Sequence, residues 1–231
     1  MTGEGIAVIL VAMDEEAAPF VERADEVSRP TRIGGAEHRG IVLGGRTHVL
    51  VRTGIGMVNG AHAAAGAIAR YGEGVHLVSA GSAGGLAKGV QVGDVVVSDS
   101  LVNVGADARA FGYALGQVPG MPVAYDGDAQ LRGALLGARG ELTVREGAIG
   151  SGERFVTSEL AEQLRGDFPH LLAVDMESAA IAQVAHNHGT RFVSVRAVSD
   201  LCAPDGTEFL THIDDAADRS AQLVVRALSA L

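Results

Sequence analysis

Three acidic residues of the sequence each follow an apolar run, and their chemistry suits proton transfer. Glu16, Glu177 and Asp200 lie at or just beyond the ends of segments rich in Val, Leu, Ile and Ala. Open α/β sheets bind ligands outside the carboxyl ends of their strands, so neighbouring strands would bring these acids to one crevice. A carboxylic acid can donate a proton to a leaving group, and a carboxylate can accept one from water. Arg196 lies inside the third apolar run and needs a carboxylate partner if it is buried.

A glycine-rich turn, Gly81-Ser82-Ala83-Gly84-Gly85, directly follows another apolar run. Glycine lets the backbone come close to a ligand, and the Ser82 hydroxyl can donate a hydrogen bond to it. A tight turn between a strand and a loop would explain the same residues.

A second glycine pattern, at residues 53–56, does not fit a dinucleotide site. The next glycine, Gly60, comes one place beyond the dinucleotide-binding spacing, and no acid ends the following strand. A dinucleotide-binding fold is therefore disfavoured.

Apolar runs alternate with helical patterns along the chain. Strands are expected at 5–12, 76–81, 94–100, 142–152, 171–175 and 191–200, and helices at 13–27, 57–72, 127–139, 158–168, 178–187 and from about 214 onward. Ser158 is the expected N-cap of its helix. Residues 38–54 alternate in a way that predicts a hairpin turning near Gly44 and Gly45. The order indicates the α/β class with a mixed sheet, and a single domain over residues 1–231 is expected, since no segment resembles a linker.

Composition and charge exclude several classes of protein. The 231 residues carry a formal net charge of -10, which disfavours nucleic acid as a partner. No apolar stretch approaches the ~20 residues of a membrane-spanning helix. The N-terminus has no basic segment before its apolar run, so we expect a cytoplasmic protein without a membrane partner. The lone cysteine, Cys202, is expected to be structural, and the eight histidines show no ligand spacing, so no metal is predicted.

Eight segments, taken in order, resemble one known family. They are AVILVAMDEEAAPF, RTGIGMVNGA, SAGSAGGL, VGDVVVSDS, ADARAFGYALGQVPG, GSGERFV, AVDMESAAIA and VRAVSD. The family is that of the bacterial 5'-methylthioadenosine/S-adenosylhomocysteine nucleosidases, within the nucleoside phosphorylase superfamily. The resemblance implies a three-layer α/β/α sandwich around a twisted mixed sheet, usually in a homodimer. It also implies hydrolysis of the bond between adenine and a 5'-thio-substituted ribose, without metal or cofactor.

The resemblance further implies roles for individual residues. Asp200 matches the acid that protonates N7 of the leaving purine, so its surroundings are expected to raise its pKa. Glu16 matches the carboxylate that deprotonates the attacking water, and Arg196 matches the partner that orients this carboxylate. The ribose hydroxyls are expected to bind Glu177 and the Met176 backbone, and Ser82 is expected near the ribose and the water. The purine is expected to contact Phe155 and the backbone around Val156, and the ribose and 5' side to contact Met13, Ile55 and Met176. The neighbouring subunit's 5' pocket is expected to receive Phe111, Tyr113 and Pro119.

The sequence departs from the family pattern near the 5' pocket. Val104-Gly105 replace a common His-Asp pair, Asp175 stands for the first glutamate of Glu-Met-Glu, and the segment 201–207 is shorter and carries Pro204. These departures leave the catalytic set complete. They put the preferred 5' substituent in question.

Three other functions share this fold. A purine nucleoside phosphorylase needs cations for phosphate, but Ser79 occupies the place of an arginine and the first loop is acidic. A futalosine-type nucleosidase differs at the 5' group, where the sequence departs. A noncatalytic nucleoside-binding protein would lose the acid or the water-binding carboxylate, and both are present. Hydrolysis is therefore favoured.

Overall fold

Eleven strands and six α-helices make up the part of the chain that the computed structural model describes, residues 5–230. The strands are β1 (Ala7–Val11), β2 (Glu26–Val27), β3 (Thr31–Ile33), β4 (Ala36–Leu43), β5 (Arg46–Arg52), β6 (His76–Gly85), β7 (Val95–Asn103), β8 (Tyr125–Asp126), β9 (Val144–Ser151), β10 (Leu171–Asp175) and β11 (Arg191–Asp200). The helices are α1 (Asp14–Arg23), α2 (Met57–Tyr71), α3 (Ala129–Gly137), α4 (Ser158–Asp167), α5 (Ser178–His188) and α6 (Thr207–Ala230), with a short 3-10 turn at Arg109–Phe111.

The strands form one mixed sheet in the order β10-β9-β7-β11-β6-β1-β5-β4-β2, with β3 paired to β4 and β8 to β7. The central strand β6 pairs in parallel with both β1 and β11. Its last residues, Gly84 and Gly85, also pair with β10, so β10, β9, β7, β11 and β6 close into a ring. The mixed α/β fold is confirmed, whereas the ring was not anticipated.

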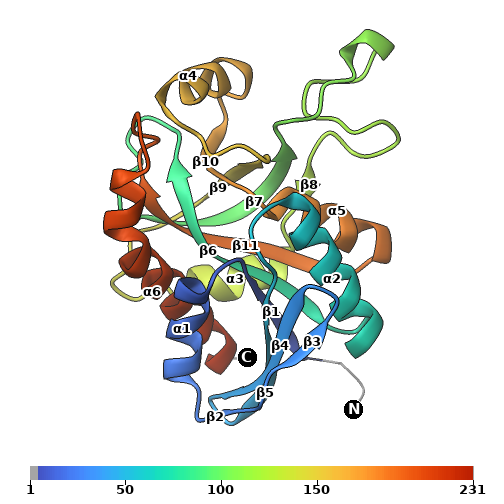
Figure 1. Ribbon diagram of the computed structural model, residues 1–231, viewed down its shortest axis with the longest axis vertical. Helices are drawn as coiled ribbons and strands as arrows, with labels where there is room; N and C mark the ends of the chain where they lie inside the picture. Colours follow the sequence, from blue (N-terminus) through green and yellow to red (C-terminus); the bar gives the residue numbers. More distant parts are fainter. Residues whose placement is uncertain (1–4, 231) are drawn as a thin grey trace.

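Helices cover both faces of the sheet (Figure 1). In β1, Ile9 packs with α1, α3 and α6 on one face. Its neighbours Val8 and Leu10 pack with α2 and α5 on the other face. A strand buried on both faces requires a continuous apolar run, which is what the sequence has at 7–11.

The predicted hairpin is confirmed. Leu43 pairs with Arg46, and the two residues between them, Gly44 and Gly45, have φ values of 56° and 77°. Side chains with a Cβ atom rarely adopt such values, so this tight turn depends on the two glycines.

Several predicted element ends are wrong. Strand β6 continues to Gly85, so residues 81–85, expected to form a glycine-rich turn, belong to the strand. Helix α1 stops at Arg23, because residues 26–27 pair with β4 instead. The N-cap of α4 is Thr157, whose backbone is extended, while the Ser158 hydroxyl donates to the Cys202 carbonyl 3.2 Å away. Helix α6 begins at Thr207 rather than near residue 214, which brings Phe209 onto a helix.

None of the helices within residues 5–230 combines the length and the apolar character that crossing a bilayer requires.

Candidate active site

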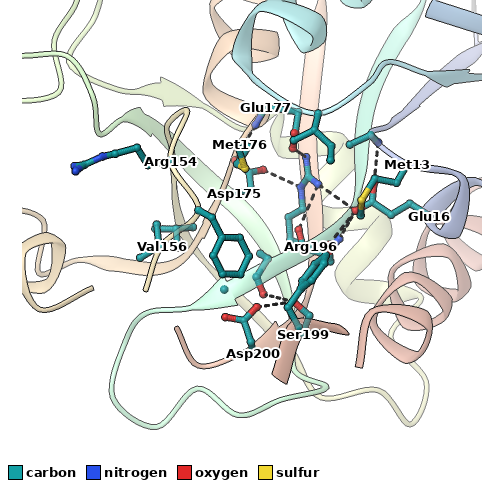
Figure 2. A pocket seen from close by; sticks show the side chains of 18 residues that line it. Met13, Glu16, Arg154, Val156, Asp175, Met176, Glu177, Arg196, Ser199 and Asp200 are labelled. Atoms are coloured by element: carbon teal, nitrogen blue, oxygen red, sulfur yellow. Dashed lines mark hydrogen bonds and ion pairs between the residues drawn. The ribbon is translucent and has the colours of Figure 1, made fainter. Parts of the chain in front are cut away.

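A cavity opens beyond the carboxyl ends of β1, β6, β10 and β11 (Figure 2). Segments far apart in the sequence supply its walls, and three of them carry Glu16, Glu177 and Asp200, as the positions of these acids predicted. The lining residues are Ala12, Met13, Glu16, Ile55, Ser82, Ala83, Gly84, Arg154, Phe155, Val156, Val174, Asp175, Met176, Glu177, Arg196, Ser199, Asp200 and Phe209.

Glu16 lies in the first turn of α1, where its buried carboxylate accepts three hydrogen bonds. Its Oε2 accepts from the Ala12 amide at 2.7 Å. Its Oε1 accepts from the Ser82 amide at 2.9 Å and from the Ser82 hydroxyl at 3.0 Å. The carboxylate is thus fixed between the ends of β1 and β6.

Gly81 allows this approach. A Cβ atom at this position would collide with Glu16 Oε1 and would lie 2.8 Å from Arg196 Nη1. The Gly81 amide donates to Ser220 Oγ of α6 at 3.0 Å, and this hydroxyl in turn donates to the Val195 carbonyl at 2.9 Å. Helix α6 therefore links the two strands that carry Ser82 and Arg196.

Arg196 lies on β11 with only 2% of its surface exposed, and three carboxylates surround it. Asp175 Oδ2 is 2.8 Å from Nε, although the N–H bond is not aligned for a hydrogen bond. Glu177 Oε2 is 3.3 Å from Nη2, and Glu16 Oε1 is 3.9 Å from Nη1. Arg196 is thus buried with carboxylate partners, as expected (Figure 2).

Glu177 follows β10 and is almost fully buried. Its Oε1 accepts a hydrogen bond from the Gly56 amide at 2.9 Å, while Oε2 faces Arg196. Burial raises the pKa of Glu177 to about 7, against the opposing effect of Arg196 and with the help of the negative charges of Asp175 and Glu16. Glu177 therefore titrates near neutral pH.

Asp200 ends β11 on another side of the cavity. Its Oδ2 accepts from the Ser199 hydroxyl and its Oδ1 from the Cys202 amide, both at 2.9 Å. Burial raises the pKa of Asp200 above its ordinary value, in spite of these two hydrogen bonds. The direction agrees with the expectation for a general acid.

Cys202 shapes this end of the site through its backbone. Its φ of 58° is the one positive value among the described non-glycine residues. Such a conformation costs energy, and here it turns the amide toward Asp200. Burial raises the pKa of the thiol to about 12, so the side chain fits a structural role and not a nucleophilic one.

Aromatic and apolar side chains form the rest of the wall. Phe155 is 45% exposed, and its ring packs edge-on against Phe209 with 5.8 Å between the ring centroids. The predicted residues Val156, Met176, Met13 and Ile55 also line the cavity.

Phe111, Tyr113 and Pro119 do not line the cavity of their own chain. They belong to the segment 104–124, which extends away from the sheet (the green segment at the upper right of Figure 1). Phe111 is 83% exposed. Their expected place in a neighbouring subunit's pocket stays a prediction.

Several polar residues around Arg196 and Asp200 were not assigned a role from the sequence. Ser79 Oγ accepts a hydrogen bond from Arg196 Nη2 at 2.8 Å, and Asp175 is the closest charge to the guanidinium. Ser79 lies inside an apolar run and Asp175 ends one. Because buried polar groups need hydrogen-bond partners, these two residues could have been predicted as partners of Arg196. Phe209 was missed because the start of α6 was placed too late. Within the described residues, no group of three or more His, Cys, Asp or Glu side chains is arranged to hold a metal ion.

The sequence profile of the phosphorylase superfamily matches residues 6–229. The chain belongs to this superfamily. A curated relative, the 5'-methylthioadenosine/S-adenosylhomocysteine nucleosidase of Geobacillus thermodenitrificans, is 40% identical over 228 residues, which cover 96% of each chain.

Solved structures of the superfamily share the fold closely. The Neisseria meningitidis 5'-methylthioadenosine/S-adenosylhomocysteine nucleosidase in complex with methylthio-immucillin-A superposes with a TM-score of 0.93 at 36% identity, covering 98% of this chain and 100% of that one. A futalosine hydrolase of Helicobacter pylori gives a TM-score of 0.91 at 26% identity, with 97% of each chain covered. The resemblance found in the sequence is thereby confirmed.

Proposed function

We propose that this enzyme hydrolyses the N-glycosidic bond of 5'-methylthioadenosine and S-adenosylhomocysteine, releasing adenine and a 5-thio-substituted ribose. The observation that supports the proposal is that one cavity holds both a group suited to activate water and a group suited to protonate a base. A fixed carboxylate, Glu16, lies beside the buried Arg196, and a carboxyl with a raised pKa, Asp200, lines the same cavity as the aromatic Phe155. The first arrangement suits activation of water and the second suits protonation of a purine.

In the proposed reaction, Asp200 donates a proton to N7 of the adenine, so that the base leaves as a neutral molecule. The bond electrons go to the base, and the ribose acquires positive, oxocarbenium-like charge. Glu16 orients a water molecule and accepts its proton as the water attacks C1'. Glu177 and the Met176 backbone hold the ribose hydroxyls, and Ser82 lies beside the water.

Water, and not phosphate, is the proposed nucleophile. A phosphate ion needs positive groups that are free to meet it. Arg196 already faces three carboxylates. Arg154 also lines the cavity, but in Figure 2 its guanidinium points away from Glu16 and Arg196.

The proposed purine site lies between Phe155 and Asp200. A ring that is 45% exposed offers area on which a purine can stack. The backbone around Val156 reads the edge of the base, and Met13, Ile55 and Met176 contact the ribose and the 5' group.

The proposed assembly is a homodimer in which Phe111, Tyr113 and Pro119 complete the partner's 5' pocket. An apolar ring that is 83% exposed on a projecting segment supports this arrangement. The cavity of a single chain also remains open beside Ile55, which is 50% exposed. We further propose that residues 1–231 form one domain and that the enzyme acts in the cytoplasm.

The test is a measurement of adenine release from purified protein with and without inorganic phosphate. We expect release at the same rate in both conditions, with free 5-methylthioribose as the second product. Phosphate-dependent release with formation of 5-methylthioribose 1-phosphate would identify a phosphorylase instead. Release of a base from futalosine but not from 5'-methylthioadenosine would favour the futalosine-type alternative.

A further inference from the structure

Three buried carboxylates share one buried guanidinium in this site. Glu16, Asp175, Glu177 and Arg196 are each no more than 8% exposed. One positive charge cannot offset three negative ones, and burial makes every uncompensated charge costly. The proposed reaction uses Glu16 and Glu177 directly but leaves Asp175 without a role.

Asp175 makes the closest approach of the three carboxylates to the arginine. Its distance to the guanidinium is 2.8 Å, against 3.3 Å for Glu177 and 3.9 Å for Glu16. It approaches Nε, the nitrogen nearest the arginine stem, which leaves Nη1 and Nη2 directed at the other two acids.

Asp175 also accepts hydrogen bonds from its surroundings. The hydroxyls of Ser151 and Ser178 donate to its two oxygens, and the Ser178 amide donates to Oδ1 at 3.2 Å. These contacts fix both carboxyl oxygens of Asp175 in place beside Arg196.

The serines are themselves fixed. Ser151 Oγ accepts from the Ala179 amide at 2.9 Å, and Ser178 Oγ lies 2.7 Å from Ser194 Oγ. These contacts join β9, α5 and β11 behind the cavity. The position of Asp175 is thus set by the fold and does not depend on a bound substrate.

We infer that Asp175 is the positioning residue of this site, which holds Arg196 by its Nε side so that the other two nitrogens orient Glu16 and Glu177 for the proposed hydrolysis. This inference rests on the proposed function. Asp175 lies closer to Arg196 than Glu177 does, and its negative charge repels that of Glu177. Arg196 therefore stabilises the charged form of Glu177 less than it would if Asp175 were absent.

A pH profile distinguishes this role from mere structural support. Glu177 is faced by Arg196 from β11, Asp175 from β10, Glu16 from α1 and the Gly56 amide before α2. Removing the charge of Asp175 removes a repelling neighbour and frees Arg196 to approach Glu177. Both effects lower the pKa of Glu177, so an acid limb that reflects this group moves to lower pH.

The experiment compares Asp175→Asn, Asp175→Glu and Ser79→Ala with the wild type. kcat and KM for adenine release from 5'-methylthioadenosine are measured from pH 4.5 to 9, with thermal unfolding as a check on folding. For Asp175→Asn we expect a loss of about 10- to 100-fold in kcat, as for other small displacements of catalytic groups. KM should change by less than about threefold, and the acid limb should move to lower pH.

Asp175→Glu keeps the charge and should recover most of kcat and the wild-type pH profile. Ser79→Ala is the matched control, since it removes an uncharged contact to the same guanidinium. It should lower kcat less and leave the acid limb in place.

A folded Asp175→Asn variant with wild-type kcat, or with lowered kcat but an unmoved acid limb, overturns the inference. If this variant does not fold, Ser151→Ala takes its place, because it weakens the hold on Asp175 without removing it. We then expect a smaller loss of kcat and a shift of the acid limb in the same direction, and an unchanged profile overturns the inference. Absence of adenine release by the wild type would instead overturn the proposed function.

Discussion

The amide and the hydroxyl of Ser82 both donate to one oxygen of Glu16, at 2.9 Å and 3.0 Å. Two donors from a single residue hold Oε1 from two directions, while the Ala12 amide holds Oε2. A carboxylate fixed at both oxygens keeps its orientation without substrate. Such preorganisation suits a group that has to align a small nucleophile.

Glu16→Gln should abolish hydrolysis and spare nucleoside binding. An amide cannot accept the proton of water. In either orientation its NH₂ group would also face a hydrogen-bond donor, the Ala12 amide or the Ser82 amide. We expect kcat to fall by about 100- to 10,000-fold, measured as adenine release, while calorimetric binding of a nonhydrolysable nucleoside changes little. Ser82→Ala, which keeps the amide donor, should lose less. A folded Glu16→Gln enzyme with near-normal turnover contradicts the role of Glu16.

Asp200→Asn keeps the size and polarity of the side chain but cannot deliver a proton. The loss in kcat should again be about 100- to 10,000-fold, with purine binding retained. Substrates whose leaving group needs no protonation provide the control, since the variant should cleave them at nearly the wild-type rate. Equal loss with both kinds of substrate would mean that Asp200 acts only in binding.

Phe111→Ala should weaken binding of 5'-alkylthio nucleosides far more than binding of adenosine, if the ring enters a partner's 5' pocket. A buried aromatic at such an interface is a frequent hot spot. Phe155→Ala is the comparison, since loss of purine stacking should weaken both ligands alike. Binding constants for the two nucleosides decide the matter, and parallel losses in Phe111→Ala would contradict the proposed place of the segment 104–124.

The same pocket should prefer apolar 5' groups, because Val104-Gly105 lacks the polar pair common in the family. With both nucleosides at equal concentration, 5'-methylthioadenosine should be consumed at least as fast as S-adenosylhomocysteine. A strong preference for the charged substrate would show that other residues set the polarity of the pocket.

Glu177→Gln should change how stability depends on pH. Glu177 has an ordinary pKa of 4.5 and a folded-state pKa of about 7, so the folded protein binds its proton more tightly than the unfolded chain. Its contribution to stability is fully present below about pH 4.5 and is lost as pH rises through about 7. The glutamine has no such loss, so the variant should gain free energy of unfolding relative to the wild type between pH 5 and pH 8. Urea unfolding at the two pH values measures this, and a constant difference would contradict the shifted pKa.

Local patterns in the sequence were enough to predict the α/β class, the hairpin at Gly44 and Gly45 and the meeting of Glu16, Glu177 and Asp200. Apolar runs mark strands buried on both faces. Glu16 and Asp200 follow or end strands that run parallel to β6, so they meet at one edge of the sheet. Glu177 follows β10, which pairs antiparallel with β6, and reaches the site through the closure of the ring. The start of α6 was missed because its first turns face solvent and the site, and therefore lack a continuous apolar stripe. The ring that β10 closes with β6 depends on Gly84 and Gly85 pairing with residues almost ninety positions away, which no local pattern reports.

The sequence also could not predict how closely each acid approaches Arg196. An arginine inside an apolar run was expected to need a carboxylate partner, but three carboxylates were available. Their order depends on which guanidinium nitrogen each one faces, and this follows from the register of β11 against β6 and from the serines behind Asp175.

Ser220 connects the end of the chain to the catalytic strands, since its hydroxyl bridges the Gly81 amide and the Val195 carbonyl. All the cavity-lining residues precede it, the last being Phe209. During synthesis, every cavity-lining residue is therefore translated before Ser220, whose hydroxyl links strands β6 and β11. A chain that stops between Phe209 and Ser220 has every cavity-lining residue but, we expect, no activity, so translation must pass Ser220 before the nascent chain can act on a nucleoside.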